Sequence, residues 1–346
     1  MWSGGGRRGP KAAQHTVVPA AEFASYYGRP VIKAPAWKHD IPLYLFAGGM
    51  SGGASLLAAG ADLSGRPDLR RAGRLTAFGG ILASTYFLIN DLGRPSRFHH
   101  MLRVAKPTSP MSMGTWILTA YGPMAGAAGT AELTALLPPA LRDALPTRLL
   151  RWGARPAGLA AAATAPLLAS YTAVLLADTA VPTWHEAYPE LPFVFVGSAA
   201  AAGAGMGLIF TRPDQAGPAR RQALIGAVGE LVAAGVMERR LGLLAEPLEH
   251  GRPGALLRAA RRLTVAGVVC GSVGGRRNRA AAVTGGAALV AGSLCTRLGI
   301  YYGGVASAKD PKYTVVPQRR RLNEGRPARY EGPDSRSGQE SAGTGA

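Results

Sequence analysis

Apolar residues gather into eight windows along this chain, and polar, charged segments separate the windows. Each window is close to the length of about 20 residues that a helix needs to cross a hydrocarbon layer of roughly 30 Å. Gly and Ala are frequent inside the windows, as in membrane helices that pack closely together. The pattern therefore predicts an all-α membrane protein with eight transmembrane helices. The predicted spans are residues 41–61, 73–92, 112–137, 157–181, 190–211, 220–238, 257–275 and 280–304.

The segments outside the windows indicate how the chain is oriented. Residues 1–40 form a polar, Pro-rich N-terminal tail, and residues 305–346 form a basic tail with little to bury, which we expect to be disordered. An even number of spans places both termini on one side of the membrane. Basic loops stay in the cytoplasm, so a multi-pass protein of the cell membrane with its termini on the outer side is expected. The basic loops are residues 62–72, 138–156, 212–219 and 275–280.

Composition narrows the possible chemistry. The net charge of +19 is explained by arginines in loops, and no nucleic-acid-binding motif accompanies it, so we expect no nucleic-acid partner. Cys270 and Cys295 lack the spacing of iron–sulfur ligands. No histidine lies in the middle of a predicted span, where a haem of a helical bundle would need one. We therefore expect no haem, no iron–sulfur cluster and no metal site in this chain, and any redox role points to a dissociable membrane quinone.

Several residues on the terminus-bearing side suit a quinone. Its head group needs hydrogen-bond donors at its carbonyls and groups that give or take protons, and Tyr, His and Asp provide both. We expect Tyr44 and Tyr171 to contact the head group and Asp91 and His99 to handle protons. Two further candidate contacts are Trp116 and Asp178. Trp116 also suits an aromatic belt at the membrane surface.

Other ionisable residues suggest proton transfer or docking. Charged groups inside spans are costly and usually functional, so Glu132 and Glu230 are candidate proton relays. Glu132 equally suits a solvated helix end. The alternative for Asp91 is an ion-pair cluster with Arg94 and Arg97, the arginines that follow it. The connections on the terminus-bearing side carry residues expected to dock a partner protein, namely Arg94, Arg97, His100 and His185.

Three stretches resemble one known family. They are "YYGRPVIKAPAWKHDIPLYLFAGGMSGG" (26–53), "DLGRPSRFHHML" with "KPTSPMSMGTWIL" (91–118), and "SYTAVLLADTAVPTWHEAYPELPFVFVGSA" (170–199). Together they resemble the NrfD/PsrC family, the membrane subunits of polysulfide- and nitrite-reductase-type complexes. The resemblance covers roughly residues 26–310, and the two tails lie outside it.

The resemblance implies two four-helix bundles without haem. It also implies exchange of electrons between a menaquinone or ubiquinone pool and a four-cluster ferredoxin-like iron–sulfur subunit, which serves a molybdopterin oxidoreductase subunit. Tyr44, Tyr171 and Asp91 match the family's quinone pocket. Tyr44 stands where some members have His, and no Asn accompanies it. This difference leaves the hydrogen bonds to the quinone, and the quinone type, open.

Two alternative functions remain. One is a structural membrane anchor without quinone turnover. The other is a transporter or proton channel that uses Asp91, Glu132, Asp178 and Glu230, although the inverted repeat typical of many transporters is not visible in the sequence. In every case the chain is expected to act within a complex and not as a complete enzyme.

Overall fold

The computed structural model describes residues 30–324, and this part of the chain is helical without any strand. The prediction of an all-helical protein is confirmed for these residues. Eight helices of 18 residues or more cover the eight apolar windows. They are α1 (Asp40–Leu63), α2 (Pro67–Asp91), α3 (Pro110–Leu133), α5 (Leu145–Ala177), α7 (Leu191–Phe210), α8 (Gly217–Leu241), α10 (Gly251–Val268) and α11 (Arg279–Lys309).

Shorter helical segments connect the long helices. The short α-helices are α4 (Pro139–Arg142), α6 (Pro182–Glu186), α9 (Glu246–Glu249) and α12 (Lys312–Asn323). Five further segments are η2 (Pro95–Leu102), η3 (Thr134–Leu136), η4 (Gly242–Ala245), η5 (Val269–Val273) and η6 (Gly274–Arg276). All of them are 3₁₀ turns except η5, which is a π-helical turn.

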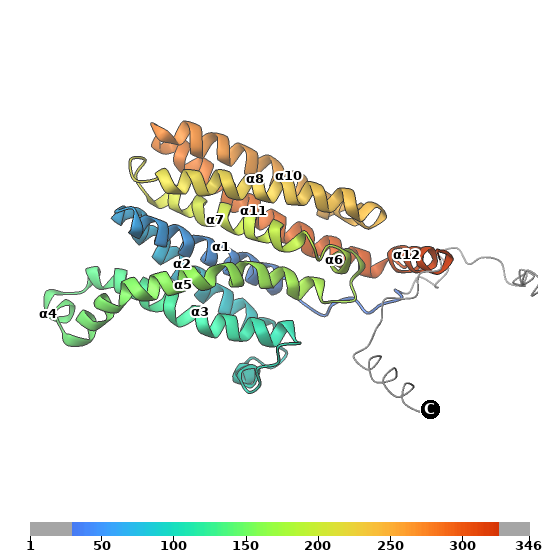
Figure 1. Ribbon diagram of the computed structural model, residues 1–346, viewed down its shortest axis with the longest axis horizontal. Helices are drawn as coiled ribbons and strands as arrows, with labels where there is room; N and C mark the ends of the chain where they lie inside the picture. Colours follow the sequence, from blue (N-terminus) through green and yellow to red (C-terminus); the bar gives the residue numbers. More distant parts are fainter. Residues whose placement is uncertain (1–29, 325–346) are drawn as a thin grey trace, which may run out of the picture.

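The long helices lie roughly parallel and form two groups (Figure 1). Helices α1, α2, α3 and α5 pack together, as do α7, α8, α10 and α11. The groups meet where α7 packs against α1 and α5, and where α11 contacts α1. The elements α6 and α12 lie at one end of the molecule, which we call the terminus end, and α4 lies at the opposite end, the α4 end.

Five of the long helices, α1, α2, α5, α7 and α11, are long and apolar enough to cross a membrane, which supports a multi-pass membrane protein. Helices α3, α8 and α10 do not meet that standard. Arginines explain this for two of them, because α8 has Arg220, Arg221, Arg239 and Arg240 near its ends and α10 contains four more.

Glycine allows the two groups to approach closely. A Cβ added at Gly53 of α1 would lie 2.1 Å from the carbonyl oxygen of Ala199 in α7, and one at Gly203 would lie 2.4 Å from the amide nitrogen of Ala54. A side chain at either position would push the backbones apart. The small residues of α1 and α7 therefore determine the distance between the groups, as in membrane helices generally.

The predicted disordered tail from residue 305 is wrong for its first 20 residues. Helix α11 continues to Lys309, and α12 follows after a short break. Lys312 Nζ and the Tyr313 hydroxyl both donate to Glu246 Oε2, at 2.6 and 3.2 Å, which attaches α12 to α9. These contacts join residues distant in sequence, so local composition did not reveal them. Residues 1–29 and 325–346 of the two predicted tails lie outside the described residues.

Candidate functional site

At the terminus end, the segment that enters α1 packs against helix ends from both groups. The indole rings of Trp37 and Trp184 stack with centroids 5.9 Å apart, and the hydroxyl of Tyr301 donates to Trp37 O at 2.7 Å. Trp184 is fully buried and donates from Nε1 to Ile300 O at 2.8 Å. The hydroxyl of Tyr302 and His39 Nδ1 are hydrogen-bonded at 2.8 Å. The entry segment thereby joins α1 to α6 and α11.

Asp91 lies at this end, on the last residue of α2. Its Oδ1 accepts a hydrogen bond from the Lys38 amide at 3.0 Å, and no bond to Oδ2 is formed within residues 30–324. The neighbouring Asn90 donates to Asp40 Oδ2 at 3.0 Å. The end of α2 is therefore bonded to the entry segment, and Asp91 Oδ2 forms no hydrogen bond within residues 30–324.

Tyr44 and Tyr171 are buried in the same apolar core, from α1 and α5. The Tyr171 hydroxyl is sealed from solvent and has no hydrogen-bond partner in the described part of the chain. The Tyr44 hydroxyl likewise forms no hydrogen bond among those residues, although its backbone oxygen accepts one from Ser84 at 3.2 Å. Buried phenols normally find a partner, so these two donors are suited to a ligand oxygen.

Gly114 of α3 makes room for the Tyr171 ring. A Cβ at this position would lie 2.2 Å from Tyr171 Cε2 and 2.9 Å from Cζ. The ring thus lies directly on the α3 backbone. Gly114 belongs to the stretch that resembles the family, but its role needed the packing of α3 on α5.

The other predicted residues of this end are exposed. Trp116 is 39 % exposed and its Nε1 lies 3.4 Å from Val104 O, and Asp178 is exposed at the end of α5. The structure thus does not bury either of them with the two tyrosines. The predicted docking residues and His99 are exposed. Arg94 immediately precedes η2, Arg97, His99 and His100 lie on η2, and His185 lies on α6. The rings of His99 and His100 contact each other edge to face at 4.5 Å, and His185 Nδ1 is hydrogen-bonded to Ala177 O.

A second polar centre lies in the other helix group, around Glu230. Its Oε1 accepts from Thr296 Oγ1 at 2.6 Å, whereas Oε2 is buried without a partner among residues 30–324. Arg297 is fully buried beside it, donates from Nη2 to Phe195 O at 2.8 Å, and places its guanidinium 3.8 Å from the Phe195 ring centroid. Its Nε and Nη1 lack partners in the same range.

Arg297 is not among the functional residues predicted from the sequence. The signal was present, because this arginine falls within the predicted span 280–304, where a charged residue is costly and usually functional. The sequence alone did not show that it lies near Glu230, since the two residues are on different helices.

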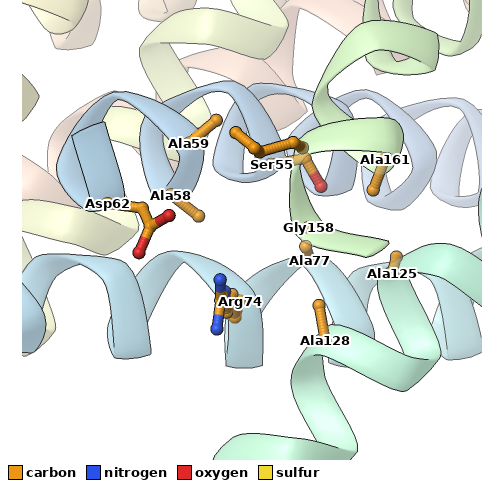
Figure 2. A pocket seen from close by; sticks show the side chains of 11 residues that line it. Ser55, Ala58, Ala59, Asp62, Arg74, Ala77, Ala125, Ala128, Gly158 and Ala161 are labelled. Atoms are coloured by element: carbon orange, nitrogen blue, oxygen red, sulfur yellow. The ribbon is translucent and has the colours of Figure 1, made fainter. Parts of the chain in front are cut away.

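Glu132 lies at the opposite, α4 end of the molecule. Its Oε1 accepts from Arg70 Nε at 3.2 Å and from Arg74 Nη1 at 3.0 Å, and Asp62 pairs with Arg70 and Arg155. A pocket of about 10 Å³ lies between α1, α2, α3 and α5, about enough for one water molecule. Asp62 and Arg74 are among the residues that line it (Figure 2). This arrangement is an ion-pair cluster at a helix end, and the relay role of Glu132 stays a prediction.

The comparisons with known proteins bear on this arrangement. The family model for polysulphide reductase, NrfD, matches residues 32–245, which is more than half of the chain. The chain belongs to the NrfD family. No curated protein matches it. The resemblance stated from the sequence is thereby confirmed, and membership of the NrfD family makes this chain a membrane subunit of a respiratory oxidoreductase complex.

The match to NrfD covers some of the polar residues and not others. It includes the entry segment and Tyr44, Asp91, Tyr171 and Glu230. It ends before α10 and α11, so Arg297 lies outside it. NrfD proteins typically associate with iron–sulfur and molybdopterin subunits. Among residues 30–324 there is no group of three or more His, Cys, Asp and Glu side chains suited to a metal ion.

Proposed function

We propose that this chain exchanges electrons and protons between the membrane quinone pool, menaquinone or ubiquinone, and a docked four-cluster ferredoxin-like iron–sulfur subunit. That subunit in turn serves a molybdopterin catalytic subunit. All eight long helices cross the membrane as two four-helix bundles. The terminus end lies on the outer side of the cell membrane, because the basic loops lie at the α4 end.

The observation that carries this proposal is the Tyr171 hydroxyl, buried without a partner in the described residues. A bound quinone would supply a two-electron carrier with two carbonyl oxygens, and each oxygen needs a hydrogen-bond donor. Tyr171 and Tyr44 donate to these oxygens from one apolar core, which also excludes water from the head group. Gly114 holds the Tyr171 ring in position. Trp116 and Asp178 lie at the exposed margin of this site.

Asp91 and His99 handle the protons. The Lys38 amide orients the Asp91 carboxylate, and the free Oδ2 accepts a proton. His99 is exposed on η2, the segment that follows α2, and passes the proton to water. In the other group, Glu230 serves as a relay whose charge is balanced by Arg297, and Glu132 serves as a relay at the α4 end.

The iron–sulfur subunit docks on the exposed basic face of η2 and α6. Arg94, Arg97, His100 and His185 form this face, and exposed charges of this kind guide the approach of an acidic partner. Electron transfer then takes place at the same end of the molecule as the two tyrosines.

Quinol turnover by the assembled complex tests the proposal. Tyr171→Phe removes only the hydroxyl, and we expect it to lower kcat/KM for quinol by roughly five- to tenfold, the value of one hydrogen bond. Asp91→Asn keeps the bond from Lys38 and removes the proton acceptor, and we expect a loss of about a hundredfold or more in kcat.

Two control variants separate chemistry from structure. Tyr86→Phe changes an exposed tyrosine of α2, and Asp40→Asn changes a carboxylate that ties the same helix end. Both should keep turnover within about twofold of the unaltered complex. Unchanged turnover in Tyr171→Phe and Asp91→Asn would instead favour the structural anchor. Purification of the chain without any iron–sulfur or molybdenum protein would favour the transporter.

A further inference from the structure

A polar cavity of about 540 Å³ opens at the α4 end of the first helix group. This volume is within the range of ligand sites in proteins, roughly 300–1,000 Å³. Residues from the ends of α1, α2, α3, α4 and α5 line it. Its arginines are Arg70, Arg74, Arg142, Arg151 and Arg155.

The cavity carries an excess of positive charge. Five guanidinium groups face three carboxylates, those of Asp62, Glu132 and Asp143. Arg70, Arg74 and Arg155 are engaged by Asp62 and Glu132 at 3.0–3.4 Å. Arg142 and Arg151 form no ion pair or hydrogen bond from their side chains within residues 30–324. Two guanidinium forks are therefore available to an anion, and phosphate suits their geometry.

An exposed apolar face lies beside these arginines. Leu145, Leu149 and Trp152 follow one another at helical spacing on the first turns of α5 and are 66, 59 and 82 % exposed. Arg151 and Arg155 lie on the neighbouring face of the same helix, about a quarter of a turn away. Leu136 and Leu141, in the connection before α5, are also exposed.

The position of this face fits the surface of a bilayer. The apolar window of α5 begins at residue 157, so the turns that carry Trp152 precede it. Figure 1 shows α4 and the start of α5 beyond the ends of the neighbouring helices. A helix with an apolar face beside a basic face lies in the interface of a membrane, and tryptophan is enriched there.

We infer that this cavity binds the phosphate of an anionic phospholipid, with the acyl chains against Leu145, Leu149 and Trp152. Basic pockets between membrane helices are suited to such head groups. A zwitterionic lipid would bring its own cation into a cavity in which five guanidinium groups already outnumber three carboxylates. A free phosphate ion would leave the apolar face uncovered. The inference depends on insertion of the chain in a membrane and not on the quinone site, which lies at the other end.

Lipid binding to the purified full-length chain tests this inference. Native mass spectrometry would compare retention of phosphatidylglycerol with that of phosphatidylcholine at equal concentration. We expect phosphatidylglycerol to be preferred and the double variant Arg142→Gln/Arg151→Gln to weaken its binding by roughly tenfold. The matched control is Arg276→Gln/Arg277→Gln, which removes two exposed arginines at the same end of the other helix group. The control should bind as the unaltered chain does.

Two further measurements separate a lipid site from other anion sites. The variant Leu149→Ser/Trp152→Ser should weaken phosphatidylglycerol binding and leave the binding of inorganic phosphate unchanged. Equal loss in both arginine variants would show that general surface charge is responsible and would overturn the inference. Inorganic phosphate that displaces phosphatidylglycerol at similar concentration would also overturn it, in favour of an ion site.

Discussion

At the scale of single residues, buried polar atoms without partners stand out against an otherwise apolar interior. The hydroxyl of Tyr171, Oε2 of Glu230 and two nitrogens of Arg297 lack a partner within residues 30–324. Leaving such a group unsatisfied costs about 1–3 kcal/mol, and more for a charge. Glu230 and Arg297 lie near each other in one helix group, so their opposite charges compensate each other in part.

The proximity of Glu230 and Arg297 predicts that a second substitution partly restores the stability lost in the first. Arg297→Met should lower the free energy of unfolding by about 3 kcal/mol, because it leaves the Glu230 carboxylate without a nearby counter-charge and the Phe195 carbonyl without its donor. The double variant Glu230→Gln/Arg297→Met should recover part of this loss, since the neutral amide needs no counter-charge. Unfolding in detergent, followed by circular dichroism, measures the free energy of unfolding of each variant.

A surface ion pair provides the control for the loss of stability in Arg297→Met. Arg261→Met breaks a pair with Glu238 whose arginine is 46 % exposed, and it should cost less than about 1 kcal/mol. If Arg297→Met proved as mild as Arg261→Met, the two buried residues would not depend on each other.

At the scale of helices, the contact of α1 with α7 depends on positions without a side chain. Gly53→Ala places a methyl group 2.1 Å from the Ala199 carbonyl oxygen, and overpacking of this kind typically costs about 1–3 kcal/mol. Gly60→Ala in the same helix meets no atom within 4 Å and should be neutral or stabilising by up to about 1 kcal/mol. The temperature of thermal unfolding should therefore fall in Gly53→Ala and stay unchanged or rise in Gly60→Ala. A similar shift in both variants would contradict close packing at Gly53.

Helix α12 is predicted to detach in part from α9 in acid. The hydrogen bond from Lys312 lowers the pKa of Glu246 below its ordinary value of 4.5. A lowered carboxyl pKa stabilises the folded state above the ordinary value, and this contribution is lost as the pH falls through the lowered pKa. Burial, and then the bond to Glu246, raise the pKa of Tyr313 to about 12. The protonated Tyr313 therefore stabilises the folded state at neutral pH, and this stabilisation is lost as the pH rises from 10.0 towards 12.

A spin label at the exposed position Gln318→Cys, with Cys270 and Cys295 replaced by Ser, would report this detachment. The label should become mobile below the ordinary pKa of the carboxyl group. In Glu246→Gln it should be more mobile at neutral pH than in the unaltered chain, because the pair with Lys312 is lost. An acid transition that persists unchanged in Glu246→Gln would assign the effect to another group.

At the scale of the whole molecule, the topology depends on whether the less apolar helices cross the membrane. If α8 and α10 both cross, the exposed positions Asp214 and Arg277 lie on one side of the membrane and His250 lies on the other. Single cysteines at these positions can be treated in intact cells with an impermeant maleimide, which reaches only the outer side. The maleimide should label the cysteine at position 250 and leave those at positions 214 and 277 unlabelled, or the reverse. Reaction of all three from one side would mean that α8 and α10 remain at the surface.

The sequence alone determined the positions of the long helices and the family of this protein. The signals for a helix and its ends are local, because they depend on a few neighbouring residues. For example, α3 begins at Pro110, and the side chain of Ser109 caps it by accepting from the Ser112 amide. The same local information placed Tyr44, Asp91 and Tyr171 as candidates. It also assigned the chain beyond residue 305 to a tail, because nothing near α12 in sequence shows that Glu246 will bind it.

Only the tertiary structure decided which distant residues meet. Arg297 lies beside Glu230, the Tyr171 ring lies on Gly114, and Glu132 lies between two arginines of α2, each across different helices. The cavity at the α4 end likewise depends on five helix ends that converge there. Such contacts follow from the packing of whole helices, which is a sum over many small side chains and is not encoded in any single stretch of sequence.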